Sequence, residues 1–566
     1  MKNKTHKTCT FYSFMLIVFS LVICWHSSAY AYVKAVHYWG GGWPLNFWSA
    51  LELDNVDEDM ELIKKDGFNT IILVVPWSEF QPGIKGPTYD KVIFDRLETV
   101  IRKADKHGVK VILRMSYLWD YAPGKELTPL ERTYGLLARQ LIYDAWLDYF
   151  REVYKRVKLN KNFLFAFISW EDFMLINNMT SYRLSDRAMF SKGTGFHDFL
   201  KEKYQLKDLS ALYGEKFTSY DDVIIPDRKD PAFRVFFEFY DYFLVERLLK
   251  GAQKFFPGLS LEIRVDADPV FGPKGDAISV FKNRFRHLLG GLLRPKEEVI
   301  SVYTHEGTYN LPGTDVVTTY YSVATGAENR GDETTAKRAL EIMQYYLKKV
   351  KEKSQGKNLF IDQFNFIDNT PYFSHNTKLK PSETDKFLEG SASVLKQYTT
   401  GYSLWGYRDY EANYFYNPAF QLGLKGWRSG GKVRVASLSD GKKAAVVSDE
   451  GYVSQFVPND RVALFGIYKE IHLCFRAKAL NGNPAISINV KNHPVITEKL
   501  TTSPDKFCHV FPMQSDYDIT FEAHGGDVAI YKATLYSHVQ KIGLYDPNGN
   551  PSPSIKAIRQ LNGMLK

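Results

Sequence analysis

From residue 33 to about residue 410, short apolar runs rich in β-branched residues alternate with longer amphipathic stretches. Several of the short runs are almost continuously apolar, which is typical of parallel strands covered by helices on both faces of a sheet. We therefore predict eight buried strands. They comprise residues 33–39, 70–77, 110–117, 163–170, 259–267, 315–323, 359–366 and 401–407.

The stretches between these runs carry apolar residues at helical spacing. Gly67 and Gly108 each follow a last helical turn that contains lysine, a common end for a helix that precedes a strand. This alternation predicts an α/β fold, a (β/α)8 TIM barrel, with an open doubly wound sheet as the alternative, although no GxGxxG follows the first strand. The predicted helices are residues 56–65, 90–106, 136–157, 233–255, 333–353 and 383–397.

After residue 412 the pattern changes to short strands separated by turn signals, which predicts a smaller all-β sandwich over residues 413–540. The segment 417–427 (NPAFQLGLKGW) resembles the opening of carbohydrate-binding jelly-roll modules. The predicted strands are residues 452–457, 470–477, 485–490, 519–523 and 528–537.

The C-terminal segment, residues 541–566, has a different pattern again. The sequence GLYDPNG at 543–549 precedes a Pro-led helical stretch at 551–561, and together they resemble the last loop and helix of barrel glycosidases. We therefore expect the barrel to span residues 32–412 and to be completed by residues 541–566, with the sandwich inserted between its last strand and its last helix.

The first 31 residues have the features of a signal peptide. A basic start is followed by an apolar run at 11–25, and Ala29 and Ala31 supply small residues for cleavage after Ala31. The run is shorter than the roughly 20 residues that cross a bilayer, and no later segment qualifies, so we expect no integral membrane span after cleavage. The prediction is export to the periplasm or the extracellular space; an uncleaved anchor is the alternative, and Ile23 disfavours a lipoprotein at Cys24.

Composition narrows the possible partners. The 566 residues are 45% hydrophobic and 24% charged, as in a globular protein. Lys+Arg exceeds Asp+Glu by 73 minus 64, or +9, and loss of Lys2, Lys4 and Lys7 leaves +6, which is too little to predict nucleic-acid binding.

Cys474 and Cys508 either form one disulfide or lie buried and unpaired. No CxxC, HExxH or Cys/His cluster is present, so the sequence predicts no metal site.

Active sites of barrels of this kind lie at the carboxyl ends of the strands. These ends carry aromatic residues and carboxylates, a mixture that suits a sugar because flat rings stack on pyranoses and charged groups bind hydroxyls. The carbohydrate-binding candidates are Trp39, Trp77, Arg114, Asp172, Asp266, Tyr320, Trp405 and Arg408, and the candidate catalytic pair is Glu171 and Asp362.

The barrel segment resembles the large clan of glycosidases that carry the acid/base on strand four and the nucleophile on strand seven. LFIDQF at 359–364 is similar to the strand-seven motif of family 42 β-galactosidases, and Asp362 matches its Glu. ISWEDF at 168–173 is similar to the strand-four motif, so the resemblance implies that Glu171 is the acid/base. Two residues depart from the clan pattern, since Trp170 stands in place of Asn and Asp362 in place of Glu.

Each candidate has a structural alternative. Glu171 competes with an ion pair to Arg114, and Asp172 is the other candidate acid. Asp362 either acts as the nucleophile or anchors a loop. Arg114 and Arg408 either bind an acidic sugar or keep the carboxylates ionised. The three tryptophans are sugar platforms or core residues, and His37 is expected to be a hydrogen-bonded structural residue.

The sequence therefore predicts an exported retaining glycoside hydrolase that acts on a polysaccharide or oligosaccharide and needs no cofactor. Retention requires the two carboxyl groups to lie roughly 5–5.5 Å apart, whereas an inverting enzyme requires roughly 6.5–9.5 Å. A non-catalytic glycan-binding protein on a degenerate barrel is the alternative from another functional class.

Overall fold

The computed structural model describes residues 31–566, except 87, 119–121, 170–171, 174–175, 177–178, 181, 228–229, 231, 264–269, 272–276, 279–310, 324–332, 368–377 and 459–467. The predicted signal peptide therefore lies outside the described residues, apart from Ala31. Among the residues described, no helix combines the length and the apolar character needed to cross a bilayer.

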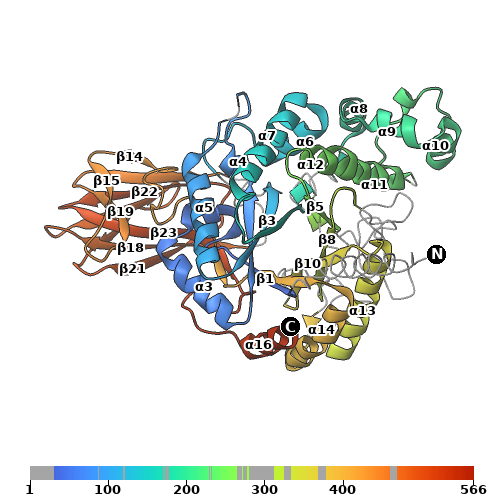
Figure 1. Cartoon of the computed structure of the whole chain (residues 1–566). Helices are drawn as coiled ribbons and strands as arrows, with labels where there is room; N and C mark the ends of the chain where they lie inside the picture. Colours follow the sequence, from blue (N-terminus) through green and yellow to red (C-terminus); the bar gives the residue numbers. More distant parts are fainter. Residues whose placement is uncertain are drawn as a thin grey trace, which may run out of the picture.

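Eight parallel strands close into a barrel, in the order β1-β12-β10-β8-β5-β4-β3-β2 (Figure 1). This confirms the predicted (β/α)8 fold and excludes the open doubly wound sheet. Each strand begins within one residue of its predicted start, and several end earlier. The strands are β1 (Val33–His37), β2 (Thr70–Pro76), β3 (Lys110–Tyr117), β4 (Phe163–Ile168), β5 (Ser260–Ile263), β8 (Val316–Ser322), β10 (Asn358–Asn365) and β12 (Gly401–Leu404).

Helices surround the barrel and bury their apolar faces against its strands (Figure 1). They are α3 (Val56–Lys65), α5 (Lys91–Lys106), α6 (Pro129–Ala138), α7 (Gln140–Val157), α11 (Phe233–Tyr242), η5 (Phe243–Leu249), α12 (Lys250–Gln253), α13 (Ala336–Lys353), α14 (Thr384–Tyr398) and α16 (Ile555–Met564). Further elements are α2 (Phe47–Ala50), α4 (Trp77–Phe80), α8 (Leu184–Gly193), α9 (Phe196–Lys203), α10 (Leu206–Tyr213), and the two-stranded pairs β6 (Val270–Phe271) with β7 (Ala277–Ile278) and β9 (Glu333–Thr334) with β11 (Lys378–Leu379).

The predicted helix 136–157 is wrong at its start, because the chain there forms two helices. Thr128 and Glu131 form a capping box that starts α6 seven residues earlier, at Pro129. Arg139 is extended and separates α6 from α7. A Cβ on Gly135 would lie 2.3 Å from Ile142, so the glycine is what lets the two helices turn closely past each other.

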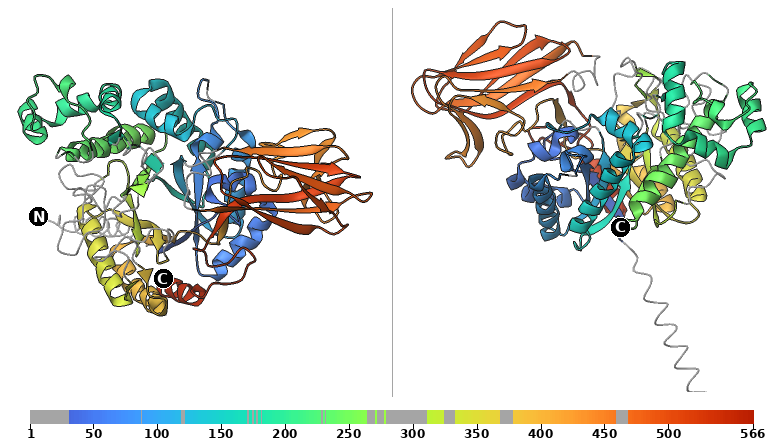
Figure 2. Two further views of the ribbon diagram at one scale, coloured as in Figure 1. Left: turned by 180° about the vertical axis from the view of Figure 1, so that it is seen from behind. Right: turned by 90° about the horizontal axis from the view of Figure 1, so that it is seen from above.

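The last helix, α16, packs beside α14 (Figures 1 and 2). Its attachment centres on Asp66, a fully buried carboxylate after α3. Asp66 accepts hydrogen bonds from Tyr407 Oη at 2.7 Å, Tyr545 Oη at 2.9 Å and Arg559 Nε at 2.9 Å. The C-terminal segment is thereby fastened to the end of β12 and to α3.

Between β12 and α16 the chain forms two stacked antiparallel sheets beside the barrel (Figure 2). One has the order β15-β16-β23-β18-β21, with β13 also paired to β23, and the other has the order β14-β17-β22-β19-β20. Their strands are β13 (Tyr410–Asn413), β14 (Arg428–Gly430), β15 (Val433–Ser437), β16 (Lys443–Val447), β17 (Tyr452–Val457), β18 (Glu470–Ala479), β19 (Ala485–Val490), β20 (Ile496–Lys499), β21 (Asp505–Pro512), β22 (Tyr517–His524) and β23 (Val528–Gln540).

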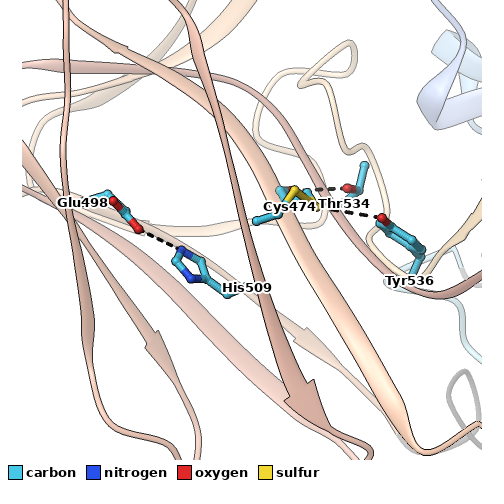
Figure 3. The surroundings of a disulfide bond; sticks show 6 residues. Cys474, Glu498, His509, Thr534 and Tyr536 are labelled. Carbon is cyan, nitrogen blue, oxygen red and sulfur yellow. Dashed lines mark hydrogen bonds and ion pairs between the residues drawn. A yellow bond between two sulfur atoms is a disulfide. The ribbon is translucent and has the colours of Figure 1, made fainter. Parts of the chain in front are cut away.

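Cys474 and Cys508 form a disulfide, which decides between the two alternatives for these residues. They lie directly opposite each other on β18 and β21, with Cα atoms 4.1 Å apart. Figure 3 shows Cys474 beside Thr534 and Tyr536 of β23, and Thr534 Oγ1 donates to the Cys474 carbonyl at 3.3 Å. The bond therefore reinforces a pairing that the strand ladder already defines.

Candidate active site

The barrel interior changes from apolar to polar along its axis. Inside the barrel, Ala35, Ile72, Ile112, Phe167 and Phe360 form one buried apolar cluster. Strand side chains alternate between faces, so the residues two positions later also point inward. Four of these five residues are polar. Three more polar residues face the same side, because Ser403 is paired with Ala35, Thr318 with Phe360 and Glu262 with Thr318. All seven are completely buried: His37, Arg114, Ser169, Glu262, Thr318, Asp362 and Ser403. We call this set the polar layer.

The strand that carries Asp362, β10, has a β-bulge at this residue. Ile361 is paired with Thr319 of β8, but the next pair joins Gln363 to Tyr320, so Asp362 is an extra residue on β10. Outside the barrel, Phe364 stacks on Phe387 of α14 with ring centroids 6.0 Å apart. Bulges of this kind re-aim side chains beside active sites. The bulge leaves both Asp362 and Gln363 on the inner side.

A buried ion pair joins two of the predicted site residues. Arg114 donates from Nη2 to Asp172 Oδ1 at 3.2 Å and from Nε to Oδ2 at 3.3 Å, and neither side chain is exposed. The guanidinium also lies 5.6 Å from the ring of Trp405, which follows β12 on another side of the barrel. Arg114 therefore reaches across the barrel mouth. Glu171, the other suggested partner of Arg114, lies outside the described residues, as does Asp266.

Glu262 is a buried carboxylate that the sequence analysis missed. It accepts a hydrogen bond from Ser169 Oγ at the end of β4. Burial raises the pKa of Tyr240 on α11 well above its usual value, and the nearby carboxylates Asp241, Asp172 and Glu262 raise it further. The signal in the sequence was a charged residue between Leu261 and Ile263, because only a polar interior tolerates a glutamate at a buried mid-strand position.

Aromatic side chains border the polar layer. Trp405 is partly exposed, and its ring lies 4.8 Å from Trp39 and 4.7 Å from His37. His37 Nδ1 lies 3.2 Å from the Leu404 carbonyl oxygen, in line with the structural role expected for this histidine. Tyr320 is buried and its hydroxyl accepts a hydrogen bond from Asn365 Nδ2 at 3.3 Å. Of the three predicted tryptophans, Trp405 has the ring surface most open to a ligand.

Two predicted binding residues are held in other interactions. Trp77 is completely buried, donates from Nε1 to Gln81 Oε1 at 2.7 Å and has the Arg132 guanidinium 4.7 Å from its ring centroid. Arg408 pairs with Asp59 of α3 at 2.6 Å. The structure thus places Trp77 in the core and Arg408 between β12 and α3, rather than with the polar layer.

Some buried polar atoms of the site have no hydrogen-bond partner among the described residues. They are Gln363 Nε2, Thr318 Oγ1 and Trp39 Nε1. Donors of this kind are costly to bury unless something binds them. Away from the barrel, the one group of described side chains close enough to share a metal ion is Glu450, Glu522 and His524 on the sandwich surface.

No family model and no curated protein matches the chain. Solved structures align with it at low identity. The exo-β-1,4-mannosidase Op5Man5 from Opitutaceae bacterium strain TAV5 aligns over 67% of this chain and 53% of its own, about half its length, with 13% identity and a TM-score of 0.39. A GH5_18 protein from Bifidobacterium longum subsp. infantis aligns over 94% and 78%, with 10% identity and a TM-score of 0.43. TmCBM61, solved with β-1,4-galactotriose, aligns over 22% and 99%, with 17% identity and a TM-score of 0.19. The barrel assignment rests on the strand pairing itself.

Proposed function

We propose that this protein is an exported glycoside hydrolase that cleaves a polysaccharide or oligosaccharide with retention of configuration. One observation carries the proposal: the completely buried carboxylate of Asp362, at a β-bulge in β10, belongs to a polar layer inside a (β/α)8 barrel. Burying ionisable groups costs free energy, and such groups concentrate where chemistry needs them.

In the proposed reaction, Glu171 protonates the glycosidic oxygen while an Asp362 carboxylate oxygen attacks the anomeric carbon. The bond from that carbon to the leaving oxygen breaks, and an ester bond to Asp362 forms. A water molecule then attacks the same carbon and gives its proton to Glu171. This step releases the sugar hemiacetal and returns Asp362 to its carboxylate form and Glu171 to its acid form.

Other side chains in and beside the polar layer support this role for Asp362. Arg114 adds a positive charge to the same buried layer. The Asp172 carboxylate is paired with Arg114, which leaves Glu171 as the better candidate for the protonated acid. The unpartnered donors on Gln363 and Thr318 are suited to bind sugar hydroxyls, and the partly exposed Trp405 is suited to stack on a pyranose face.

Export is part of the proposal. The basic, then apolar, N-terminal segment with Ala29 and Ala31 supports it. The Cys474–Cys508 disulfide also supports it, because such bonds persist mainly in oxidising compartments. The similarity of the strand-seven motif to family 42 β-galactosidases stays a prediction, as does carbohydrate binding by the sandwich.

The test is release of reducing ends from a panel of neutral and acidic polysaccharides. We compare the wild type with Glu171→Gln and Asp362→Asn, and use Asp315→Asn, an exposed Asp at the amino end of β8, as the matched control. We expect the two site variants to lose turnover and the control to keep it. Activity that survives in either site variant contradicts the proposed pair. Glycan binding without turnover by the wild type favours the non-catalytic alternative, and inverted product stereochemistry favours an inverting mechanism.

A further inference from the structure

The outer surface of one sandwich sheet carries a row of three cations. Arg476 of β18 is directly opposite Lys506 of β21 on one side and Lys532 of β23 on the other. All three side chains are exposed. Their sequence neighbours Phe475 and Phe507 stack between the two sheets with ring centroids 5.1 Å apart, so the cations point away from the sandwich core.

Two further cations extend this surface. Lys478 follows Arg476 by two positions on β18, and Arg434 of β15 reaches the same face through the paired residues Val446 and Ala529. We call Arg434, Arg476, Lys478, Lys506 and Lys532 the basic face. Figure 1 shows β18, β21 and β23 side by side in the sheet that carries it.

The row is electrostatically unfavourable in the isolated protein. Like charges placed directly opposite each other on neighbouring strands cost roughly 0.2–1 kcal/mol per pair. Within the described part of the chain, no ion pair or hydrogen bond joins Arg476, Lys506 or Lys532 to another residue. By contrast, two exposed cations in and beside the other sheet lie next to carboxylates: Arg428 contacts Asp518, and Lys491 contacts Asp516.

We propose that the basic face binds an acidic polysaccharide, a polyuronate chain, at a site separate from the polar layer of the barrel. Neighbouring strands lie about 4.8 Å apart, so the three cations follow one another at a spacing comparable to the length of one pyranose residue. A flat row of Lys and Arg suits an extended chain that presents one carboxylate per sugar, and Arg adds bidentate hydrogen bonds to such a group. This inference goes beyond the proposed hydrolysis and does not depend on it.

The test is native affinity electrophoresis of the whole mature chain in gels containing polygalacturonate or neutral galactomannan. The triple variant Arg476→Gln, Lys506→Gln, Lys532→Gln removes the row, and its exposed side chains are not needed for folding. The matched control is Lys207→Gln, Lys216→Gln, Lys254→Gln, which removes the same charge from exposed positions in and beside the helices on the side of the barrel away from the sandwich (Figure 2).

We expect polygalacturonate to retard the wild type and the control equally, and the row variant to bind at least tenfold more weakly. We also expect the retardation to fall with added salt, because the contacts are exposed. Equal retardation of the row variant and the wild type overturns the proposal, and so does an equal loss in the control, which indicates an effect of net charge alone. Row-dependent binding to anionic phospholipid vesicles but not to polygalacturonate also overturns it. Asp362→Asn keeps the binding if the inference is right, even if the barrel proves inactive.

Discussion

The barrel and the sandwich differ in where their charged side chains lie. Inside the barrel, Arg114, Glu262 and Asp362 are completely buried. Between the two sheets the buried side chains are mostly apolar, as Ile488 and Phe521 illustrate. The exposed cations of the sandwich, Arg476 among them, lie on its outer surface.

This difference separates groups that stabilise a fold from groups that are kept for chemistry. Burying apolar side chains stabilises a fold. A buried ion pair seldom stabilises it more than the apolar packing that would replace the pair. The sandwich follows the rule for a structural core, and the polar layer departs from it. Because the barrel buries charged groups in its polar layer, we assign the proposed chemistry to the barrel. We assign polyanion binding to the sandwich, whose cations lie on its surface.

The largest expected effect follows from breaking the buried ion pair. Arg114→Met leaves the Asp172 carboxylate buried next to an apolar side chain, and we expect it to lower the free energy of unfolding by about 3–5 kcal/mol. Arg476→Met on the sandwich surface is the control, with an expected change within about 0.5 kcal/mol. Urea unfolding monitored by fluorescence measures both, and equal changes in the two variants contradict the comparison.

The next effect concerns the disulfide. Cys474 and Cys508 are 34 residues apart, and closing a loop of that length is worth about 4 kcal/mol in the chain-entropy model. We expect the double variant Cys474→Ala, Cys508→Ala to destabilise the sandwich by about 2–4 kcal/mol and to leave any barrel activity at low temperature unchanged. Limited proteolysis followed by mass spectrometry locates the loosened region, and cleavage confined to the barrel would refute the prediction.

A smaller effect depends on pH. Burial lowers the pKa of His538 on β23 to about 4, against about 6.5 in an unfolded chain. The unfolded chain therefore binds more protons between these values, so the His538 contribution is complete above pH 6.5 and is lost as the pH falls towards 4. We expect a loss on the order of 2–3 kcal/mol over this window. His538→Gln removes that part of the pH dependence, and an unchanged profile of unfolding midpoint against pH argues against it.

The smallest effect tests the repulsion within the cation row. Arg476→Glu places an anion between Lys506 and Lys532, and we expect it to raise the unfolding free energy by roughly 0.2–1 kcal/mol. Raising the ionic strength shrinks the gain because the charges are exposed. Thermal unfolding in low and high salt measures this, and a variant less stable than the wild type in low salt is the contrary result.

The strands of the barrel were predictable because each is a dense apolar run with few equivalents elsewhere in the chain. The sandwich was harder. In strands β15 and β21, exposed polar residues such as Arg434 and Lys506 alternate with residues that are mostly only partly buried. The hydrophobic signal of these strands is therefore weak. These two strands were not predicted from the sequence, and neither were β13, β14, β16 and β20, whereas β17 and β19 were predicted with their correct bounds.

The candidate site was predictable in part, through the rule that strand ends carry chemistry. That rule selected Arg114, Asp172, Asp362 and Trp405, which lie at the barrel mouth. It also selected Trp77, whose ring the structure buries against Arg132, because local sequence does not show which neighbours a strand end meets. The bulge at Asp362 and the Arg114–Asp172 pairing depend on the register between β10 and β8 and on contacts between β3 and the segment after β4, which the sequence pattern leaves open.

The most direct test of the central claim is to measure turnover and stability together for Asp362→Asn. If the polar layer is kept for chemistry, the neutral isostere lowers turnover more than about 10³-fold, while the urea midpoint stays the same or rises, since a charge no longer has to be buried. A variant that stays active but unfolds at a clearly lower urea concentration would show that Asp362 serves the fold, and would contradict the account.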